Sequence, residues 1–99
     1  MIDARTDANH KLIAAAARAA GASVHETHRV GGGFPDLALG IAGLTLLVEV
    51  KTATGKLNAN ERRWHADWRG QVAVCQTVEE AVRLVERWRA LGEMVEGRR

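Results

Sequence analysis

The stretch that decides the fold runs over residues 31–51 and reads GGGFPDLALGIAGLTLLVEVK. Two apolar runs flank the pair Ala42-Gly43, so the pattern predicts a β-hairpin with these two residues at the centre of its turn. Pairing outward from that turn places Asp36 directly opposite Glu49. The predicted hairpin therefore brings two acids together, which needs a physical reason.

The two faces of the hairpin differ because side chains alternate along a strand. One face is entirely apolar, and we expect it to face the core: Leu37, Leu39, Ile41, Leu44, Leu46, Val48 and Val50. The other face carries Asp36, Glu49 and Lys51. These three side chains are the candidate catalytic residues.

Opposed carboxylates destabilise a sheet unless something lies between them. Two such groups about 5 Å apart repel by about 3 kcal/mol at an effective dielectric constant of about 20. A divalent cation bound by Asp36 and Glu49 would remove this repulsion, and oxygen ligands suit Mg²⁺ or Mn²⁺. Lys51 points the same way as Glu49 and reaches a water or a phosphate beside the metal. A cation, a water and a lysine together indicate phosphodiester hydrolysis.

Other arrangements of this stretch are open at the level of the sequence. A longer turn would shift the pairing, and an even shift would leave the acids as diagonal neighbours on one face. For an isolated E-x-K, a solvated edge strand with Asp36 as a turn cap is the commoner arrangement. The combination of Pro-Asp and E-x-K across one hairpin, with the core on the opposite face, favours the functional site.

Helix and strand signals predict a single α/β domain over residues 1–99, in the order αβββαβα, with a mixed central sheet flanked by helices. Thr6 or Asp7 can cap the first helix. Capping boxes begin at Asn58 and Thr77. The expected elements are a helix to about residue 20, strands at 22–30, 36–41, 44–51 and 71–76, helices at 58–70 and 77–91 ended by Gly92, and a basic tail at about 93–99.

The helices are expected to bury apolar stripes at helical spacing. The first helix should turn inward Leu12, Ile13, Ala16, Ala17 and Ala20. The last helix should turn inward Val78, Ala81, Val82, Val85, Trp88 and Leu91. Trp64 and Trp68, four residues apart, and Cys75 in the last strand are also expected to lie in the core.

Composition indicates a globular protein of the cytoplasm. The 99 residues are 46% hydrophobic and 26% charged, with a formal net charge of +2. The single cysteine cannot form an internal disulfide, and no stretch is long and apolar enough to span a bilayer. The opening residues, MIDARTD, lack the order of a secretion signal. We therefore expect a cytoplasmic location and no membrane partner.

The residues around the hairpin resemble a known nuclease motif. FPD, twelve intervening residues and EVK look like the PD-(D/E)xK motif. The wider context, with GGG before Pro-Asp, LNANE after the lysine and a Trp-His pair in the next helix, is similar to the small VRR-NUC-type domains of that superfamily. The resemblance covers residues 7–84 and implies a restriction-endonuclease-like core, as in Holliday-junction resolvases.

The same resemblance implies a nuclease that depends on Mg²⁺ or Mn²⁺. Asp36 and Glu49 would hold the metal together with the backbone carbonyl of Val50. Lys51 would position the attacking water and stabilise charge on the scissile phosphate. Cleavage would leave 5′-phosphate and 3′-hydroxyl ends.

Two positions depart from the family's pattern. Glu61 stands where relatives carry a glutamine; it can contact a metal-bound water or complete the Asn58 capping box, and the cap is the expected role. Leu12 stands where many relatives carry a glutamate in the first helix. The residues that could substitute for that glutamate, unless none does, are Asp7, Asn9 and His10.

Several residues near the predicted site are candidate DNA contacts. The arginines could equally form a solvated helix face, and His65 could be an ordinary surface histidine. The glycines of the 31–33 run could let a nucleic-acid backbone approach or simply form a loose turn. The candidate contacts are Gly33, Lys56, Arg62, Arg63, His65 and Arg69.

No organic cofactor and no zinc are expected. Gly55-Lys56 lacks the other residues of a P-loop, and Pro35 is incompatible with a dinucleotide-binding turn. His25 and His28 would lie on opposite faces of one strand, which argues against a shared zinc ion.

The predicted function is that of a DNA endonuclease, with selectivity for a DNA structure such as a branched junction as one option. The alternative is a non-catalytic DNA-binding or assembly module that keeps the nuclease fold. A domain this small offers little surface to a duplex, so a homodimer is expected.

Overall fold

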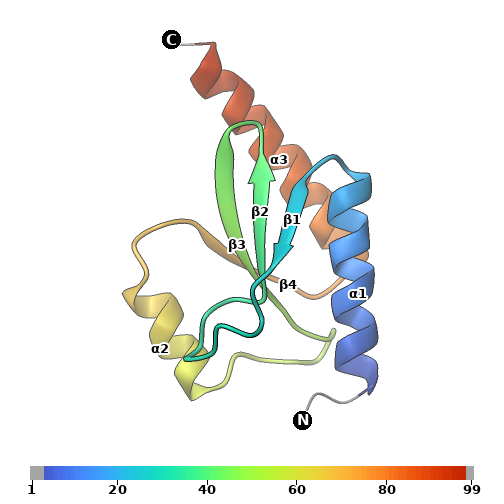
Figure 1. Cartoon of the computed structure of the whole chain (residues 1–99), viewed down its shortest axis with the longest axis vertical. Coiled ribbons are helices and arrows are strands. Elements are labelled where there is room, and N and C mark those ends of the chain that lie inside the picture. The colour runs from blue at the N-terminus through green and yellow to red at the C-terminus, as the bar shows by residue number, and fades with distance from the viewer. Residues whose placement is uncertain (1–3, 98–99) are drawn as a thin grey trace.

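A four-stranded mixed sheet carries the fold (Figure 1). The computed structural model describes residues 4–97. The strands lie in the order β1-β2-β3-β4, with β1–β2 and β2–β3 antiparallel and β3–β4 parallel. The predicted αβββαβα order and mixed sheet are confirmed. The elements are α1 (Ala4–Ala19), β1 (Ser23–Glu26), β2 (Leu37–Ile41), β3 (Leu44–Val50), α2 (Ala59–Asp67), β4 (Val72–Cys75) and α3 (Val78–Glu96).

The β2–β3 hairpin has the predicted register. Ile41 pairs with Leu44, so Ala42 and Gly43 form a two-residue turn. Both turn residues have positive φ angles, 49° and 83°, as a type I′ turn requires. Because this turn fixes the pairing, the position of Asp36 is set opposite that of Glu49.

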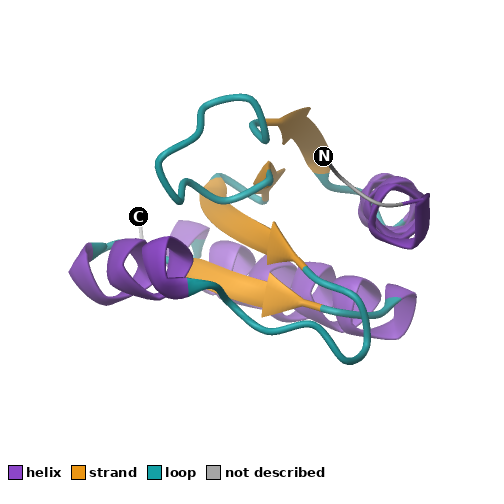
Figure 2. Ribbon diagram, turned by 90° about the horizontal axis from the view of Figure 1, so that it is seen from below, coloured by secondary structure: helices purple, strands orange, loops and turns teal. Residues whose placement is uncertain are grey.

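The core lies on one face of the sheet, where α1 and α3 contact each other and cover the strands (Figure 2). The apolar face predicted for the hairpin is buried except for Leu44, which is only partly covered. The buried core cluster comprises Ile13, Ala14, Ala17, Ala22, Leu37, Leu39, Ile41, Leu46, Val48, Val50, Cys75, Ala81 and Val85.

The rotation of α1 about its axis differs from the prediction. Leu12 was expected to face inward, but it is 58% exposed. The Asn9 side chain donates hydrogen bonds to the backbone carbonyls of Lys51 and Gln76 and thereby fixes which side of α1 meets the sheet. Ile13, one turn later on that side, is buried, whereas Leu12 lies outside it.

The start of α1 and the end of β1 also differ from the prediction. Thr6 and Asp7 lie inside α1 rather than capping it, because the helix begins at Ala4. The first strand ends at Glu26, since Thr27 turns into the following loop: its N–H donates to the Asp36 carbonyl and its hydroxyl donates to the Pro35 carbonyl.

The prediction that Gly92 ends the last helix is wrong. The helix continues to Glu96, so residues 93–96 of the predicted basic tail are helical, while Arg98 and Arg99 lie outside the described residues. Gly92 is buried against the hairpin turn, where a Cβ atom would overlap the Ala42 carbonyl oxygen. The glycine therefore permits close packing of α3 on the turn. Leu91, expected inward, is 40% exposed.

The capping box predicted for α2 is present at Asn58 and Glu61. The helix ends at Asp67, three residues before the predicted end, and buries none of its residues. The core positions expected for Trp64 and Trp68 are therefore wrong. Their rings stack at a centroid distance of 4.7 Å, and the Phe34 ring meets Trp64 edge-on at 5.2 Å.

These aromatic contacts pack α2 against the loop that precedes β2 instead of against the core. Cys75, in contrast, is fully buried as predicted, and burial raises the pKa of its thiol to about 11. Thr77 caps α3, but its capping box is altered, because Glu80 accepts from the backbone N–H of Gln76.

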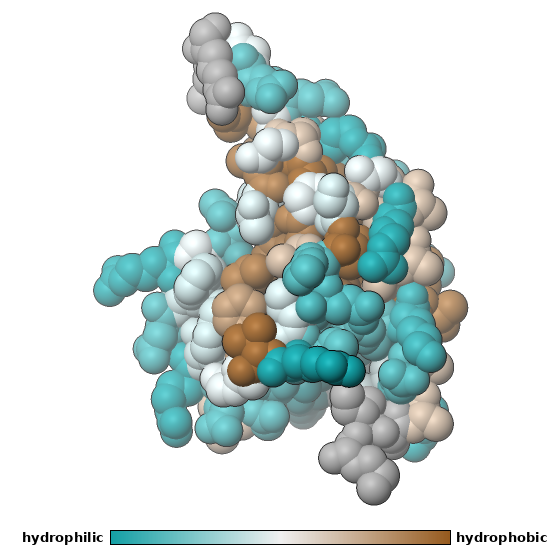
Figure 3. Space-filling model, viewed as in Figure 1, coloured by the Kyte–Doolittle hydropathy of each residue, from teal (hydrophilic) through white to brown (hydrophobic). Residues whose placement is uncertain are grey.

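The exposed surface is mixed in character. On the face seen in Figure 3, apolar side chains form small patches interrupted by polar ones. Over residues 4–97, no helix is both long enough and apolar enough to cross a membrane.

Replacing Gly92 by alanine should destabilise the protein by about 1–3 kcal/mol, because the added methyl group forces α3 away from the hairpin turn. Urea denaturation measures this change. Gly97→Ala is the matched control, since the nearest atom to a Cβ there lies at 3.4 Å and the φ angle is −64°. Equal stability of the two variants would contradict the proposed contact.

Candidate functional site

Asp36 and Glu49 meet at the end of the β2–β3 hairpin, as the register predicts. Asp36 directly precedes β2, and its Oδ2 accepts a hydrogen bond of 2.9 Å from the backbone N–H of Val50. Glu49 lies in β3 and is only 2% exposed. A buried carboxylate thus lies beside a second one. Together with Lys51 and Glu61, these two acids form what we call the acid site.

Glu49 is electrostatically strained in the absence of a cation. Its Oε1 atom is buried without a hydrogen-bond partner. Burial raises its pKa to about 9, and the neighbouring carboxylates of Asp36 and then of Glu61 add to this shift. The protonated form of Glu49 is therefore more favoured than in an ordinary glutamate.

Lys51 supplies one positive charge to the acid site. Its Nζ lies 2.8 Å from Oε1 and 3.0 Å from Oε2 of Glu61, and 3.5 Å from Oε2 of Glu49. Burial alone would lower the pKa of the lysine, but the hydrogen bond to Glu61 and the neighbouring carboxylates outweigh it and raise the pKa. Lys51 therefore remains a cation and a hydrogen-bond donor.

Glu61 has two roles, of which the sequence predicted only the cap. Its Oε1 accepts from the Asn58 N–H at 2.8 Å, and its own N–H donates to Asn58 Oδ1 at 2.9 Å. The same carboxylate binds Lys51. The hydrogen bonds to Lys51 and to the Asn58 N–H lower its pKa although burial acts the other way. The sequence feature that could have predicted the contact with Lys51 is the position of Glu61, in the first turn of the helix that follows the lysine.

Asn9 occupies a structural position beside the acid site. Its Nδ2 donates to the carbonyl of Lys51 at 2.7 Å and to that of Gln76 at 3.2 Å. The Gln76 amide in turn donates to the carbonyls of Thr52 and Gly55 at 3.2 and 3.1 Å. These bonds hold the chain just after Lys51, and no sequence pattern indicated the part played by Gln76.

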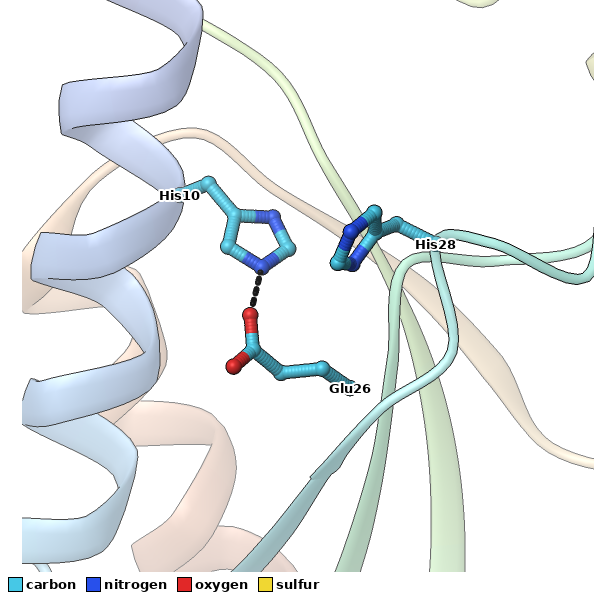
Figure 4. A group of neighbouring side chains, drawn as sticks. All are labelled: His10, Glu26 and His28. Carbon is cyan, nitrogen blue, oxygen red and sulfur yellow. Dashed lines mark hydrogen bonds and ion pairs between the residues drawn. The ribbon is translucent and has the colours of Figure 1, made fainter.

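Asp7 and His10 lie on one wall of a hollow of about 90 Å³ whose other wall includes Asp36 and Val50. Asp7 forms an ion pair of 3.5 Å with Lys11. His10 Nε2 lies 2.8 Å from Glu26 Oε1 (Figure 4). The complete lining is Thr6, Asp7, His10, Lys11, Glu26, His28, Asp36 and Val50.

The residues of the acid site fit a hard divalent cation. Glu49 offers an unpartnered buried oxygen, and Asp36 offers a second carboxylate. The N–H and C=O of one strand residue point to the same side, so the carbonyl of Val50 faces the side of Asp36, to which its N–H donates. Oxygen donors of this kind suit Mg²⁺ or Mn²⁺.

The candidate DNA contacts lie on α2 and its flanking loops. Arg63 is exposed, whereas Arg62 donates to the Leu57 carbonyl at 2.7 Å. His65 Nε2 is buried without a partner, and burial lowers the pKa of this histidine. Lys56 and Arg69 are exposed.

Gly33 has an intramolecular role. Its φ angle is +86°, and a Cβ atom would lie 2.7 Å from the Asn60 carbonyl oxygen, so the glycine allows the loop to pack closely on α2. Gly31 and Gly32 also have positive φ angles, but nothing lies within 4 Å of their Cβ positions. Those two glycines are the ones that leave open space.

No protein-family model matches the sequence, and neither a curated protein nor a solved structure matches it significantly. The geometry of the acid site and the motif that it contains therefore carry the functional argument.

Glu49→Gln should change how the stability of the metal-free protein depends on pH. The folded-state pKa of about 9 exceeds the ordinary value of 4.5, so the folded protein keeps a proton that the unfolded chain loses. This contribution to stability is fully present below pH 4.5 and is lost as the pH rises towards 9, at up to about 1.4 kcal/mol per pH unit. The glutamine variant lacks this pH-dependent part of the stability, because its side chain does not ionise.

Chemical denaturation of both proteins between pH 5 and pH 9, with a chelator present, measures the difference. As the pH rises, the free energy of unfolding of the Glu49→Gln variant should increase relative to that of the wild type. Parallel stability profiles would mean that Glu49 ionises normally in the folded state.

Proposed function

We propose that this protein is a metal-dependent DNA endonuclease of the PD-(D/E)xK type, hydrolysing phosphodiester bonds to 5′-phosphate and 3′-hydroxyl ends. The observation that carries the proposal is the buried, unpartnered oxygen of Glu49 beside Asp36, with a cationic lysine 3.5 Å away. A stable sheet gains nothing from this arrangement, whereas a cation site requires it.

Asp36, Glu49 and the Val50 carbonyl are the residues that would hold Mg²⁺ or Mn²⁺. When bound there, the ion supplies Lewis-acid polarisation of a phosphate oxygen and neutralises developing charge. Asp36 is held for this task by the Val50 N–H, which fixes one of its oxygens. Because the pKa of Glu49 is raised, binding of the ion there would be coupled to release of a proton from this side chain.

Lys51 acts as an electrostatic group. Because its pKa is raised, it cannot serve as a general base near neutral pH. As a persistent cation it can donate hydrogen bonds to the attacking water and to a phosphate oxygen, which positions the nucleophile and stabilises negative charge. To do so it must leave at least one of its contacts with Glu61.

DNA is the proposed substrate because exposed cations lie near Glu61 in the sequence, on α2 and its flanking loops. Arg63 and Arg69 lie on or directly after α2, the helix that carries Glu61, and Lys56 lies in the loop leading to it. Such side chains bind phosphates irrespective of sequence. We further propose that two copies associate, because one domain with principal extents of 45 × 29 × 21 Å offers little surface to a duplex.

A second candidate is a DNA-binding or assembly module without catalysis. One observation favours it: Lys51 is already bound by both oxygens of Glu61. The α1 residue bonded to the chain just after Lys51 is the amide Asn9, while the α1 carboxylate of Asp7 is paired with Lys11 in the hollow that Asp36 also lines.

Lys51→Ala should abolish conversion of supercoiled plasmid and of branched DNA in the presence of Mg²⁺ or Mn²⁺. The loss is expected because Lys51 is the cation that lies beside Glu49 and Glu61 in the acid site. Gel electrophoresis of the products, with end-labelling to identify the 5′-phosphate, provides the measurement. Arg87→Ala, which removes an exposed charge from α3, is the control and should cleave like wild type. If neither wild type nor Lys51→Ala cleaves the DNA, or if the two cleave it equally, the proposed nuclease activity is excluded.

Glu61→Gln should increase cleavage severalfold, because glutamine keeps the capping acceptor but releases Lys51 from its ion pair. Asn58→Ala separates the two roles of Glu61: it removes the cap, at a cost of about 1 kcal/mol in unfolding free energy, and leaves the ion pair. Its cleavage rate should stay near that of wild type. An inactive Glu61→Gln protein that folds normally would show that the ion pair is needed.

A further inference from the structure

A second group of metal-ligating side chains lies outside the acid site. His10 comes from α1, Glu26 from the last position of β1, and His28 from the loop that follows. We call these three residues the histidine cluster. They are brought together from three separate parts of the chain, and none of them has a role in the nuclease chemistry proposed above.

The three side chains point toward a common position (Figure 4). One ligand atom of each residue lies within 4.8 Å of the ligand atoms of the other two. His10 Nε2 is 2.8 Å from Glu26 Oε1, and the two imidazole rings meet at 78° with their centroids 5.4 Å apart. The three ligand atoms therefore surround one small region between α1, β1 and the loop after β1.

The set of donors is chemically distinct from that of the acid site. Two imidazoles and one carboxylate are a ligand set that proteins use for Zn²⁺, with metal–ligand distances of about 2.0–2.2 Å. Tetrahedral coordination at those distances separates ligand atoms by about 3.3 Å. The ligand atoms of the histidine cluster, all within 4.8 Å of one another, would have to settle at this spacing, and a cation would replace the hydrogen between His10 and Glu26.

The first strand is shorter than predicted, and this changes the position of His28. The predicted strand over residues 22–30 would place His25 and His28 on opposite faces. The strand ends at Glu26, however, and the turn at Thr27 carries His28 back to the side of Glu26. His25 remains exposed in the strand, outside the cluster.

The surroundings leave room for an ion and a small ligand. All three residues line the hollow of about 90 Å³, together with Asp7, Lys11 and Asp36. Asp7 is paired with Lys11, so the negative charge of Asp36 remains on the far wall. A cation held by the cluster would therefore face an acidic cavity.

We propose that His10, Glu26 and His28 bind one Zn²⁺ ion, with a fourth coordination position open to the hollow. The ion would join α1 to β1 and to the loop preceding β2. This site shares no ligand with the acid site, although Asp36 and Val50 line the same hollow.

Zinc binding to the untagged 99-residue chain tests the proposal. Competition with a chromophoric zinc chelator gives stoichiometry and affinity, and Co²⁺ as a spectroscopic substitute reports the coordination geometry. We expect one Zn²⁺ per chain, a higher unfolding temperature with Zn²⁺ and visible Co²⁺ bands of four- or five-coordinate strength. His28→Ala and Glu26→Gln should each weaken zinc binding by at least about tenfold. His25→Ala, the matched control from the same strand, should bind like wild type.

The double variant Asp36→Asn, Glu49→Gln separates this site from the acid site. It should lose nuclease activity and retain zinc with wild-type affinity. Loss of zinc by that variant would place the ion at the acid site and overturn the proposal. The proposal also fails if wild type binds no zinc, or if His25→Ala weakens binding as much as His28→Ala. Circular dichroism of the metal-free variants verifies that each is folded.

Discussion

The burial of Glu49 beside a second carboxylate is the constraint on which the rest of the structure depends. The type I′ turn sets the hairpin register, and α3 packs on that turn through Gly92, so the two acids cannot move apart along the strands. Removing one charge from water costs several kcal/mol unless a partner compensates. Lys51 meets part of this cost, and the raised pKa of Glu49 reflects the part that remains. The proposed divalent cation would compensate that remainder.

Compensation of this charge also explains the position of α2. The helix buries none of its own residues and is held by two side-chain contacts: Glu61 to Lys51, and Trp64 to the Phe34 ring. Its N-terminal capping box orients the Glu61 carboxylate toward the lysine. Local helix chemistry and site electrostatics are thus joined in one side chain, which makes α2 part of the acid site instead of a neighbour of it.

The sequence predicted those features that depend on neighbouring residues. The hairpin register follows from strand alternation and a two-residue turn, and the α2 cap follows from residues three apart. Features set by distant contacts could not be predicted. Leu12 faces solvent because Asn9 bonds to groups 42 and 67 residues away. Glu61 binds Lys51 only because α2 docks beside β3, and His28 joins its cluster only because β1 ends early. The metal-binding and catalytic roles of Asp36, Glu49 and Lys51 remain predictions.

Anomalous diffraction from crystals grown with Mn²⁺ tests the central claim most directly, because it locates the ion without reference to activity. The account predicts a manganese peak bridging the carboxylates of Asp36 and Glu49, within about 2.5 Å of both and of the Val50 carbonyl oxygen. It also predicts that the peak is lost in Glu49→Gln crystals. An occupied Mn²⁺ position elsewhere, with Glu49 still unliganded at saturating metal, would contradict it.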